Sequence, residues 1–396
     1  MNNKNMKKNI NINYMFISLM SFSLTEGVWM LYLASKGLSL FEIGLMESIF
    51  HITSFLMEVP TGIVADIYGR KISRSLGRLM AIVSTIIMIF GKSPLYFALG
   101  FIFAAISYNL ESGAGDALIY DSMKELGSEK KYMKVKGNQE VFFQIANASS
   151  LLLGGYLATL DYGLVYKTNL IIGIVTFMVS LSFVEPRIYE KEDENTISSF
   201  YNQIKKSIKI IIKDKRILFL IIIGEFFSNF YTTEFFYIQN LLKSYGYNEF
   251  HIGLIISLGG VFSALVGSRV YLIEKKLGPR KMLMIFPLIA IICFWGVTFK
   301  NLIIPFFMIL SIIECILFIT ISDYINRLIP SKQRATILSF QSMAFSLIMI
   351  IFFPIIGKIG DLYGLDFSFK FIAAIATLVL GLLVVRIKIE KDIEEK

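Results

Sequence analysis

The stretch Gly62-Ile-Val-Ala-Asp66-Ile-Tyr-Gly69-Arg70-Lys71 is a short charged gap between two long apolar runs. The runs cover about residues 41–64 and 72–91, and ~20 apolar residues in a helix cross the ~30 Å hydrocarbon core of a bilayer. Gly69 permits a tight turn, and Gly62 permits close packing of two helices. The stretch therefore predicts two membrane-spanning helices joined by a short, positively charged connection.

Apolar runs of similar length recur along the whole chain of 396 residues. The composition agrees, because 55% of the residues are hydrophobic and 17% are charged, with a mean hydropathy of +0.64, whereas soluble domains carry roughly 25% charged residues. We therefore expect an all-α polytopic membrane protein with twelve transmembrane helices, and neither a large soluble enzyme nor a disordered chain. The predicted spans are about 12–35, 41–64, 72–91, 94–120, 138–160, 164–184, 217–242, 250–272, 281–299, 302–325, 335–357 and 367–386.

The number of Lys and Arg residues alternates between high and low in successive gaps between the predicted spans. Of the 39, only seven fall in or beside the gaps that follow odd-numbered spans, namely Lys36, Lys92, Lys167, Lys243, Lys300, Lys358 and Lys370. Because cytoplasmic connections are enriched in Lys and Arg, we expect a multi-pass protein of the cell membrane with both termini in the cytoplasm. Loops that face anionic lipid would explain the net charge of +9. The same distribution leads us to expect no Lys or Arg inside a span.

The two ends of the map and its middle carry further expectations. The first run is too long for a signal peptide and lacks a small-residue cleavage site, so we expect a retained first helix. In the middle, residues 185–216 form the longest polar gap, and Ile204–Ile212 has the pattern of an amphipathic helix on the membrane surface. We therefore predict an N-terminal six-helix half over 1–184, a cytoplasmic linker over 185–216 and a C-terminal six-helix half over 217–396.

The charged gap quoted first resembles the signature G-x-x-x-D-x-x-G-R-K of the major facilitator superfamily of secondary transporters, and it lies between the second and third spans, as in that family. The resemblance implies the major facilitator fold and a conformational latch made of Gly62, Asp66, Gly69, Arg70 and Lys71. Asp66 would meet the positive end of a neighbouring helix. Arg70 would pair with an acid at the cytoplasmic end of the fourth span, where this chain has Asp121.

The fifth span bears on the direction of transport. Antiporters of the superfamily often carry a Gly-rich and Pro-containing pattern there; this chain keeps small residues at several of those positions, including Gly154 and Gly155, but has Leu151 in place of the proline. The resemblance favours an antiporter, while close helix packing alone also explains small residues. Proton-coupled members often have an arginine in the fourth span where this chain has Asn109, so that Glu111 and Asp116 would have to compensate.

Nine acidic residues and one histidine fall inside the predicted spans. An ionisable group in a span is costly to insert and usually faces a cavity. Glu47, Glu58, Glu234 and Asp323 lie near predicted helix ends, where we expect them to reach water. Asp116 is a further acid in the spans. The remaining four acids and the histidine lie deeper, namely Glu26, Glu111, Glu225, Glu314 and His51.

Glu26 is the leading candidate for proton coupling. Low-dielectric surroundings penalise the charged form of a carboxyl group, so Glu26 can take up and release a proton; a hydrogen bond between helices is the alternative role. In the second span, Glu47, His51, Ser54 and Glu58 share one helix face. On this face, His51 would either relay protons or form a hydrogen bond between helices.

The resemblance also implies that spans one, four, seven and ten line a central cavity. Glu26, Glu111, Glu225 and Glu314 would then be its central acids. Polar side chains on these and neighbouring spans complete the candidate set, namely Asn109, Gln144, Asn147 and Asn229.

We expect a proton-coupled exporter of small amphipathic compounds, cationic or neutral, that resembles drug/proton antiporters, because acids within the spans attract cations. The alternative is proton-coupled uptake of a sugar or another metabolite. The sequence shows no nucleophile–base pair, no metal-ligand spacing and no phosphate-binding loop, so we expect neither an enzyme nor a cofactor or metal. The expected partners are the substrate, protons and membrane lipid, without nucleic acid, and the expected state is a monomer.

Overall fold

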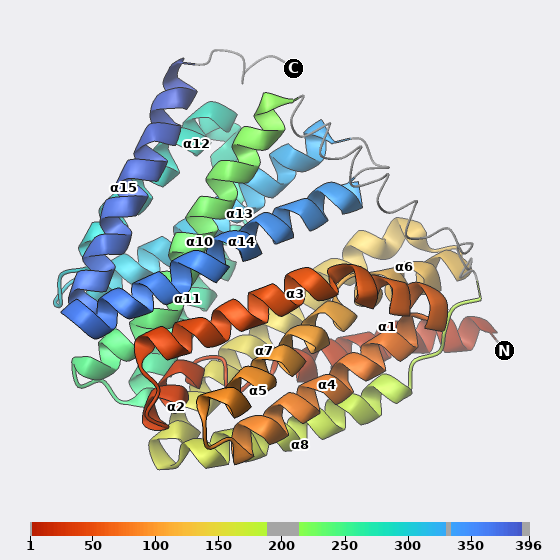
Figure 1. Ribbon diagram of the computed structural model, residues 1–396. Helices are drawn as coiled ribbons and strands as arrows, with labels where there is room; N and C mark the ends of the chain where they lie inside the picture. The colour runs from red at the N-terminus through yellow and green to blue at the C-terminus, as the bar shows by residue number, and fades with distance from the viewer. Residues whose placement is uncertain (1, 188–213, 330–333, 390–396) are drawn as a thin grey trace. The chain divides into compact units, whose positions relative to one another are not determined.

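A computed structural model describes residues 2–187, 214–329 and 334–389, and every regular element within these ranges is a helix (Figure 1). The predicted surface helix at 204–212 lies outside these ranges. The helices before the linker are α1 (Asn2–Ser21), α2 (Trp29–Ser35), α3 (Leu40–Tyr68), α4 (Arg70–Phe90), α5 (Pro94–Glu111), α6 (Ala114–Glu125), a 3-10 turn (Glu129–Lys131), α7 (Tyr132–Leu160) and α8 (Tyr162–Leu181). Those after it are α10 (Lys215–Ser244), α11 (Glu249–Gly267), α12 (Val270–Val297), α13 (Ile303–Leu328), α14 (Arg334–Tyr363) and α15 (Leu365–Ile389).

The described helices are those of a membrane protein. Eleven helical stretches are long and apolar enough to cross a bilayer, and they lie at the predicted spans two to twelve. Large apolar side chains remain exposed on them, for example Leu56 at 63% and Phe90 at 73%. Apolar surfaces of this kind are unfavourable in water, so they suit contact with lipid. The predicted all-α polytopic fold is confirmed.

The predicted first span is divided into two helices. α1 ends at Ser21, α2 begins at Trp29, and the non-helical segment between them contains Glu26. The backbone N–H of Leu24 in this segment donates a hydrogen bond to Asn169 Oδ1 at 3.1 Å, as a backbone group inside a membrane requires. Gly154 of α7 leaves room for the segment, because a Cβ at Gly154 would overlap the carbonyl oxygen of Leu24. The break therefore depends on the close approach of α7.

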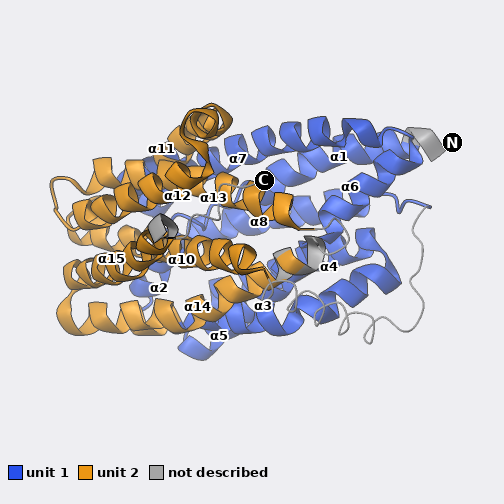
Figure 2. Ribbon diagram, turned by 90° about the horizontal axis from the view of Figure 1, so that it is seen from above, with its two compact units in different colours: residues 1–38, 45–196, 248–257 blue, residues 39–44, 197–247, 258–396 orange. Residues whose placement is uncertain are grey.

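The chain separates into two compact units (Figure 2). Unit 1 contains residues 1–38, 45–196 and 248–257, and unit 2 contains residues 39–44, 197–247 and 258–396. In unit 1, buried Phe16, Leu118 and Phe183 belong to one apolar cluster. In unit 2, Met282 and Ile316 join α12 to α13. The first residues of α3 and of α11 thus belong to a different unit from the rest of their helices.

Candidate functional site

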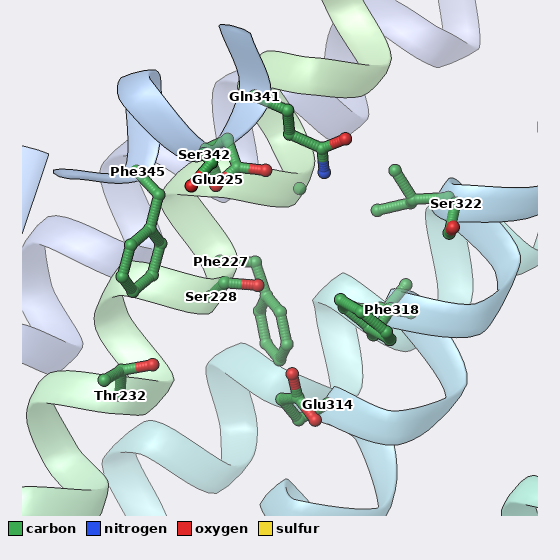
Figure 3. Close-up of a pocket in the computed structure, with 13 residues that line it drawn as sticks. Glu225, Phe227, Ser228, Thr232, Glu314, Phe318, Ser322, Gln341, Ser342 and Phe345 are labelled. Atoms are coloured by element: carbon green, nitrogen blue, oxygen red, sulfur yellow. The ribbon is translucent and has the colours of Figure 1, made fainter. Parts of the chain in front are cut away.

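Unit 2 contains a cavity of about 380 Å³ between α10, α13 and α14. Two carboxylic acids line it, Glu225 from α10 and Glu314 from α13. Figure 3 shows Glu225 beside Gln341 and Ser342 of α14, with Glu314 at the other end of the cavity and Ser228 between them. The structure therefore brings two of the predicted acids to one cavity.

The cavity combines hydrogen-bonding groups with aromatic walls. Glu225 is 6% exposed, and the side chain of Gln341 donates a hydrogen bond to its carboxylate. Phe227, Phe318 and Phe345 supply apolar surface. Among the described residues that line the cavity there is no Lys, Arg or His. Such a site can bind an amphipathic cation through a carboxylate and aromatic faces, and its carboxylates can also hold a proton.

Asn229, another predicted residue, stands next to this cavity without lining it. Its Nδ2 donates to the backbone oxygen of Glu225 at 2.8 Å and to that of Phe345 at 3.4 Å, which ties α10 to α14. On the other side of α10, the hydroxyl of Tyr231 donates to Ser311 Oγ of α13 at 3.2 Å. These bonds fix the three helices that form the cavity.

Glu234 is buried, contrary to the expectation that it reaches water. It is 1% exposed, and its Oε1 has no hydrogen-bond partner among the described residues. The prediction was wrong because α10 continues to Ser244 and its last turns are covered, with Ile238 and Leu242 both 0% exposed. Distance from a predicted helix end is a poor measure of burial when neighbouring helices cover that end.

In unit 1, the structure brings Glu26 together with Asn147. Asn147 Nδ2 of α7 donates to Glu26 Oε2 at 2.8 Å, across the break between α1 and α2. Leu151 of α7 lies against Gly27, which follows Glu26. Gln144, predicted for the same site, instead donates to Glu140 of its own helix at 2.8 Å. Glu26 thus occupies a non-helical segment in the predicted first span, a position typical of binding sites in transporters.

The polar residues on one face of the second predicted span make their contacts within unit 1. His51 Nε2 lies 3.4 Å from Glu47 Oε1 on the same helix. Glu47 is only 9% exposed, contrary to the expectation that it reaches water. Ser54 donates to Asn109 Oδ1 of α5 at 2.7 Å, and Asn109 Nδ2 donates back to the Ser54 carbonyl. Asn109 therefore connects α3 to α5.

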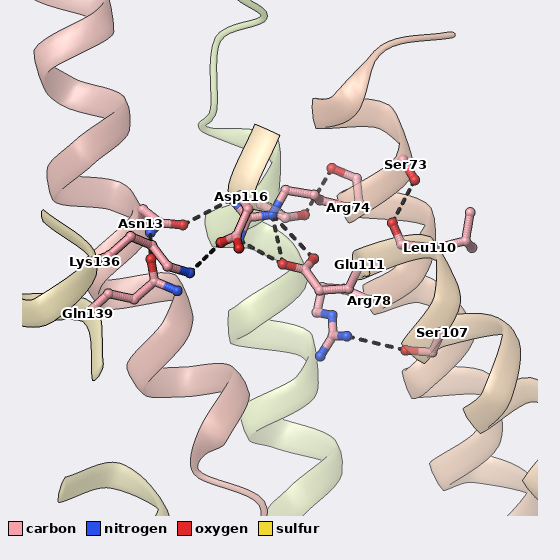
Figure 4. Close-up of polar contacts among 12 residues, drawn as sticks. Asn13, Ser73, Arg74, Arg78, Ser107, Leu110, Glu111, Asp116, Lys136 and Gln139 are labelled. Carbon is pink, nitrogen blue, oxygen red and sulfur yellow. Dashed lines mark hydrogen bonds and ion pairs between the residues drawn. The ribbon is translucent and has the colours of Figure 1, made fainter. Parts of the chain in front are cut away.

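Arg74 and Arg78 of α4 contradict the expectation that no basic residue lies inside a span (Figure 4). The Arg74 side chain is 0% exposed and forms an ion pair with Glu111 at 2.8 Å. Arg74 also donates to Asn13 Oδ1 at 3.0 Å, and its guanidinium lies over the rings of Phe16 and Phe183. The prediction was wrong because Arg74 and Arg78 were counted with the charged gap, although both fall inside the predicted span 72–91 and inside α4, which begins at Arg70.

Glu111 and Asp116 have different surroundings from those predicted. Glu111 is the last residue of α5 and neutralises Arg74, so this acid is not an isolated buried carboxyl. Gly113, with φ +75°, then turns the chain into α6. Asp116 in α6 is 57% exposed and pairs with Lys136 at 2.6 Å.

The predicted latch residues Arg70 and Asp121 form an ion pair. Arg70 Nη1 also donates to the carbonyl of Ala117 at 3.0 Å. Sequence reasoning missed Glu185, whose carboxylate accepts the backbone N–H groups of Arg70 and Lys71 at 2.8 Å each. Glu185 thereby caps α4. The available signal was an acid directly after the sixth span, but only the tertiary fold places it at the start of α4.

The family model of the Major Facilitator Superfamily matches residues 12–303 and 270–395. An uncharacterized MFS-type transporter of Bacillus subtilis (strain 168), YxaM, is 28% identical over 373 residues, which cover 92% of each chain. An uncharacterized transporter of Rickettsia felis (strain ATCC VR-1525 / URRWXCal2) is 26% identical over 54% of this chain and 52% of its own length.

Solved structures show the same fold. The nucleoside transporter NupG matches with a TM-score of 0.75 and 13% identity, over 98% of this chain and 100% of its own. A bacterial homologue of the human lysosomal transporter Spinster, in an inward-facing and unoccupied conformation, matches with a TM-score of 0.74 and 14% identity, over 97% of each chain. The signature gap, the helical architecture and the family match lead to one conclusion: the chain is a secondary transporter that belongs to the major facilitator superfamily.

Proposed function

We propose that this transporter exports small amphipathic compounds, cationic or neutral, across the plasma membrane in exchange for protons. The observation that carries the proposal is the cavity of α10, α13 and α14, where Glu225 and Glu314 accompany three phenylalanines. A carboxylate with little access to water attracts a cation and repels an anion. Aromatic rings add cation–π attraction for an ammonium or guanidinium group.

Coupling follows if substrate and proton compete for the same carboxylates. A proton that binds Glu225 or Glu314 removes the negative charge and so weakens the hold on a cation. Glu26, bonded to Asn147 in the broken first span, is the second coupling site. In the proposed orientation both termini are cytoplasmic, and the working unit is a monomer.

Uptake of a sugar or another metabolite is the second candidate function. The observation in its favour is the row of neutral polar groups in the same cavity, Ser228, Thr232, Gln341 and Ser342, which can hydrogen-bond to hydroxyl groups. In that case neutral polyols would be the preferred substrates, and their flux would run with the proton gradient.

The test uses purified protein in vesicles with an imposed pH gradient and three matched compounds: a cationic, a neutral and an anionic amphipath. We expect flux of the cation and the neutral compound against the proton gradient, accompanied by proton movement. Glu225→Gln and Glu314→Gln should each reduce the cation's flux at least tenfold more than the neutral compound's, and Glu26→Gln should act in the same direction. Asp323→Asn is the matched control, because Asp323 is an exposed acid of α13 that pairs with Arg327.

Three results would reject the proposal: efficient flux of the anion by the wild type, equal losses of cation and neutral flux in Glu225→Gln and Glu314→Gln, or sodium dependence without proton movement. Flux of neutral polyols that is driven into the vesicles by inward proton flow would instead support the uptake candidate.

A further inference from the structure

The end of α14 repeats the pattern that ends α3. Residues 357–364 read Gly357-Lys-Ile-Gly-Asp361-Leu-Tyr363-Gly364, which matches Gly62, Asp66, Tyr68 and Gly69 at the same spacing. The helices end at the two tyrosines, and the glycines that follow share a positive φ, +86° at Gly364 and +99° at Gly69. Only the Arg-Lys pair is missing, because Leu365-Asp366 comes next. The charge distribution predicts that the two copies lie on opposite sides of the membrane.

In the second copy, the aspartate caps a helix. The two oxygens of Asp361 accept the backbone N–H groups of Leu40 and Phe41 at 2.9 Å each. These are the first two residues of α3, and helix N-termini leave such donors unpaired and carry partial positive charge. The contact lies within unit 2, which takes in residues 39–44, whereas the rest of α3 belongs to unit 1.

Small residues let the two helix ends approach closely around this cap. A Cβ at Gly44 would lie 2.6 Å from the Cα of Pro354, and a Cβ at Gly357 would overlap the carbonyl oxygen of Leu40. The hydroxyl of Tyr237 bonds to the carbonyl oxygens of Phe353 at 3.0 Å and of Leu40 at 3.4 Å. The first turn of α3 is therefore held by α14 through backbone, carboxylate and hydroxyl contacts.

We propose that Asp361 is a positioning residue for transport: it latches the predicted extracellular end of α3 to α14, and it acts in opposition to Asp66 at the other end of α3. A transporter needs one barrier on each side of the membrane, and the two barriers must open in turn. One helix with a similar latch at each end can couple the two barriers. Breaking one latch should then favour the state in which the other is made. This inference rests on the proposed transport function.

The test is amide hydrogen exchange on the full-length wild type and variants in lipid nanodiscs, without substrate. Asp361→Asn keeps the side-chain size but replaces one of the two acceptor oxygens with an N–H donor, so it should speed exchange at residues 40–44 roughly tenfold, the size expected for loss of a hydrogen bond to a charged group. It should also slow exchange at residues 62–72, at the far end of α3. Asp66→Asn should give the opposite pair of changes, and the double variant should return both regions toward wild type.

Two controls separate a latch from a local cap. Asp161→Asn replaces an acid that caps its own helix, α8, through Gly163 N–H at 2.9 Å, and should change neither region. Gly357→Ala leaves Asp361 intact but forces α14 away from Leu40, so it should act like Asp361→Asn, whereas Gly381→Ala, with open space around it, should have no effect.

A change confined to residues 40–44 in both Asp361→Asn and Gly357→Ala would overturn the inference, as would additive rather than opposing effects of Asp66→Asn and Asp361→Asn. Since exchange is read without substrate, absence of flux in the vesicle assay would reject the proposed substrates and coupling and leave this result standing.

Discussion

At the residue scale, the buried charge of Arg74 determines the role of Glu111 in unit 1. Arg74 is enclosed by two aromatic rings and held by Glu111 and Asn13. The loss of one partner from a buried ion pair typically costs about 3–5 kcal/mol, because the other charge stays buried and unpaired. Removal of either Arg74 or Glu111 should therefore destabilise the fold of unit 1, and Glu111 is not among the acids that we propose to bind substrate.

We expect Glu111→Gln to lower the stability of the protein far more than Asp116→Asn does. Asp116 is an exposed acid that pairs with Lys136, and exposed ion pairs contribute about 0–1 kcal/mol. Thermal unfolding of the purified variants in one detergent measures the difference. A double variant, Arg74→Met with Glu111→Met, should regain much of the loss because no unpaired charge remains. Equal melting temperatures for Glu111→Gln and Asp116→Asn would contradict this role.

At the scale of elements, close packing against α7 stabilises the non-helical backbone between α1 and α2. The segment that contains Glu26 stays non-helical beside Gly154 of α7, where no side chain fits. A Cβ at the next residue, Gly155, would lie 2.6 Å from the carbonyl oxygen of Glu249 in α11. The small residues of α7 thus have a packing role in this structure, whichever direction transport takes.

We expect Gly154→Ala to displace the segment between α1 and α2 and to reduce transport strongly, because the new methyl group would overlap the Leu24 carbonyl oxygen. Hydrogen exchange at residues 22–28 should become several-fold faster. Gly137→Ala is the matched control in the same helix, since nothing lies near a Cβ there. Unchanged exchange and flux in Gly154→Ala would show that the segment does not depend on this contact.

At the scale of the whole molecule, the signature between α3 and α4 should govern turnover rather than affinity. We expect Asp66→Asn and Arg70→Ala to reduce transport at least tenfold while equilibrium substrate binding stays within about threefold of wild type, because a latch changes the populations of conformations and not the contacts with substrate. Binding measured on folded protein, beside flux in vesicles, provides the check. A collapse of binding in Asp66→Asn would place this residue in the substrate site.

Hydropathy and one motif were enough to predict the fold class, the family and the partnership of Arg70 with Asp121. Local sequence could not predict the break at Glu26, because its contacts are with Asn147, Gly154 and Asn169, all more than 120 residues away in the chain. It also misplaced Arg74 and Glu234, whose burial depends on which helices cover them. The candidate site was therefore predictable as a set of acids, but the grouping of Glu225 with Glu314 and the pairing of Glu111 with Arg74 required the tertiary structure.

The residues that follow α8 determine where the chain can be cut. Phe183 lies in the core of unit 1, the Val184 N–H bonds to Asn9, Glu185 caps α4 and the Arg187 N–H bonds to Glu125. A split version of the protein, expressed as two polypeptides that reassemble, should therefore end its first fragment after Arg187. A fragment that ended at Val184 would leave the first turn of α4 without its cap, beside the signature that is expected to control turnover.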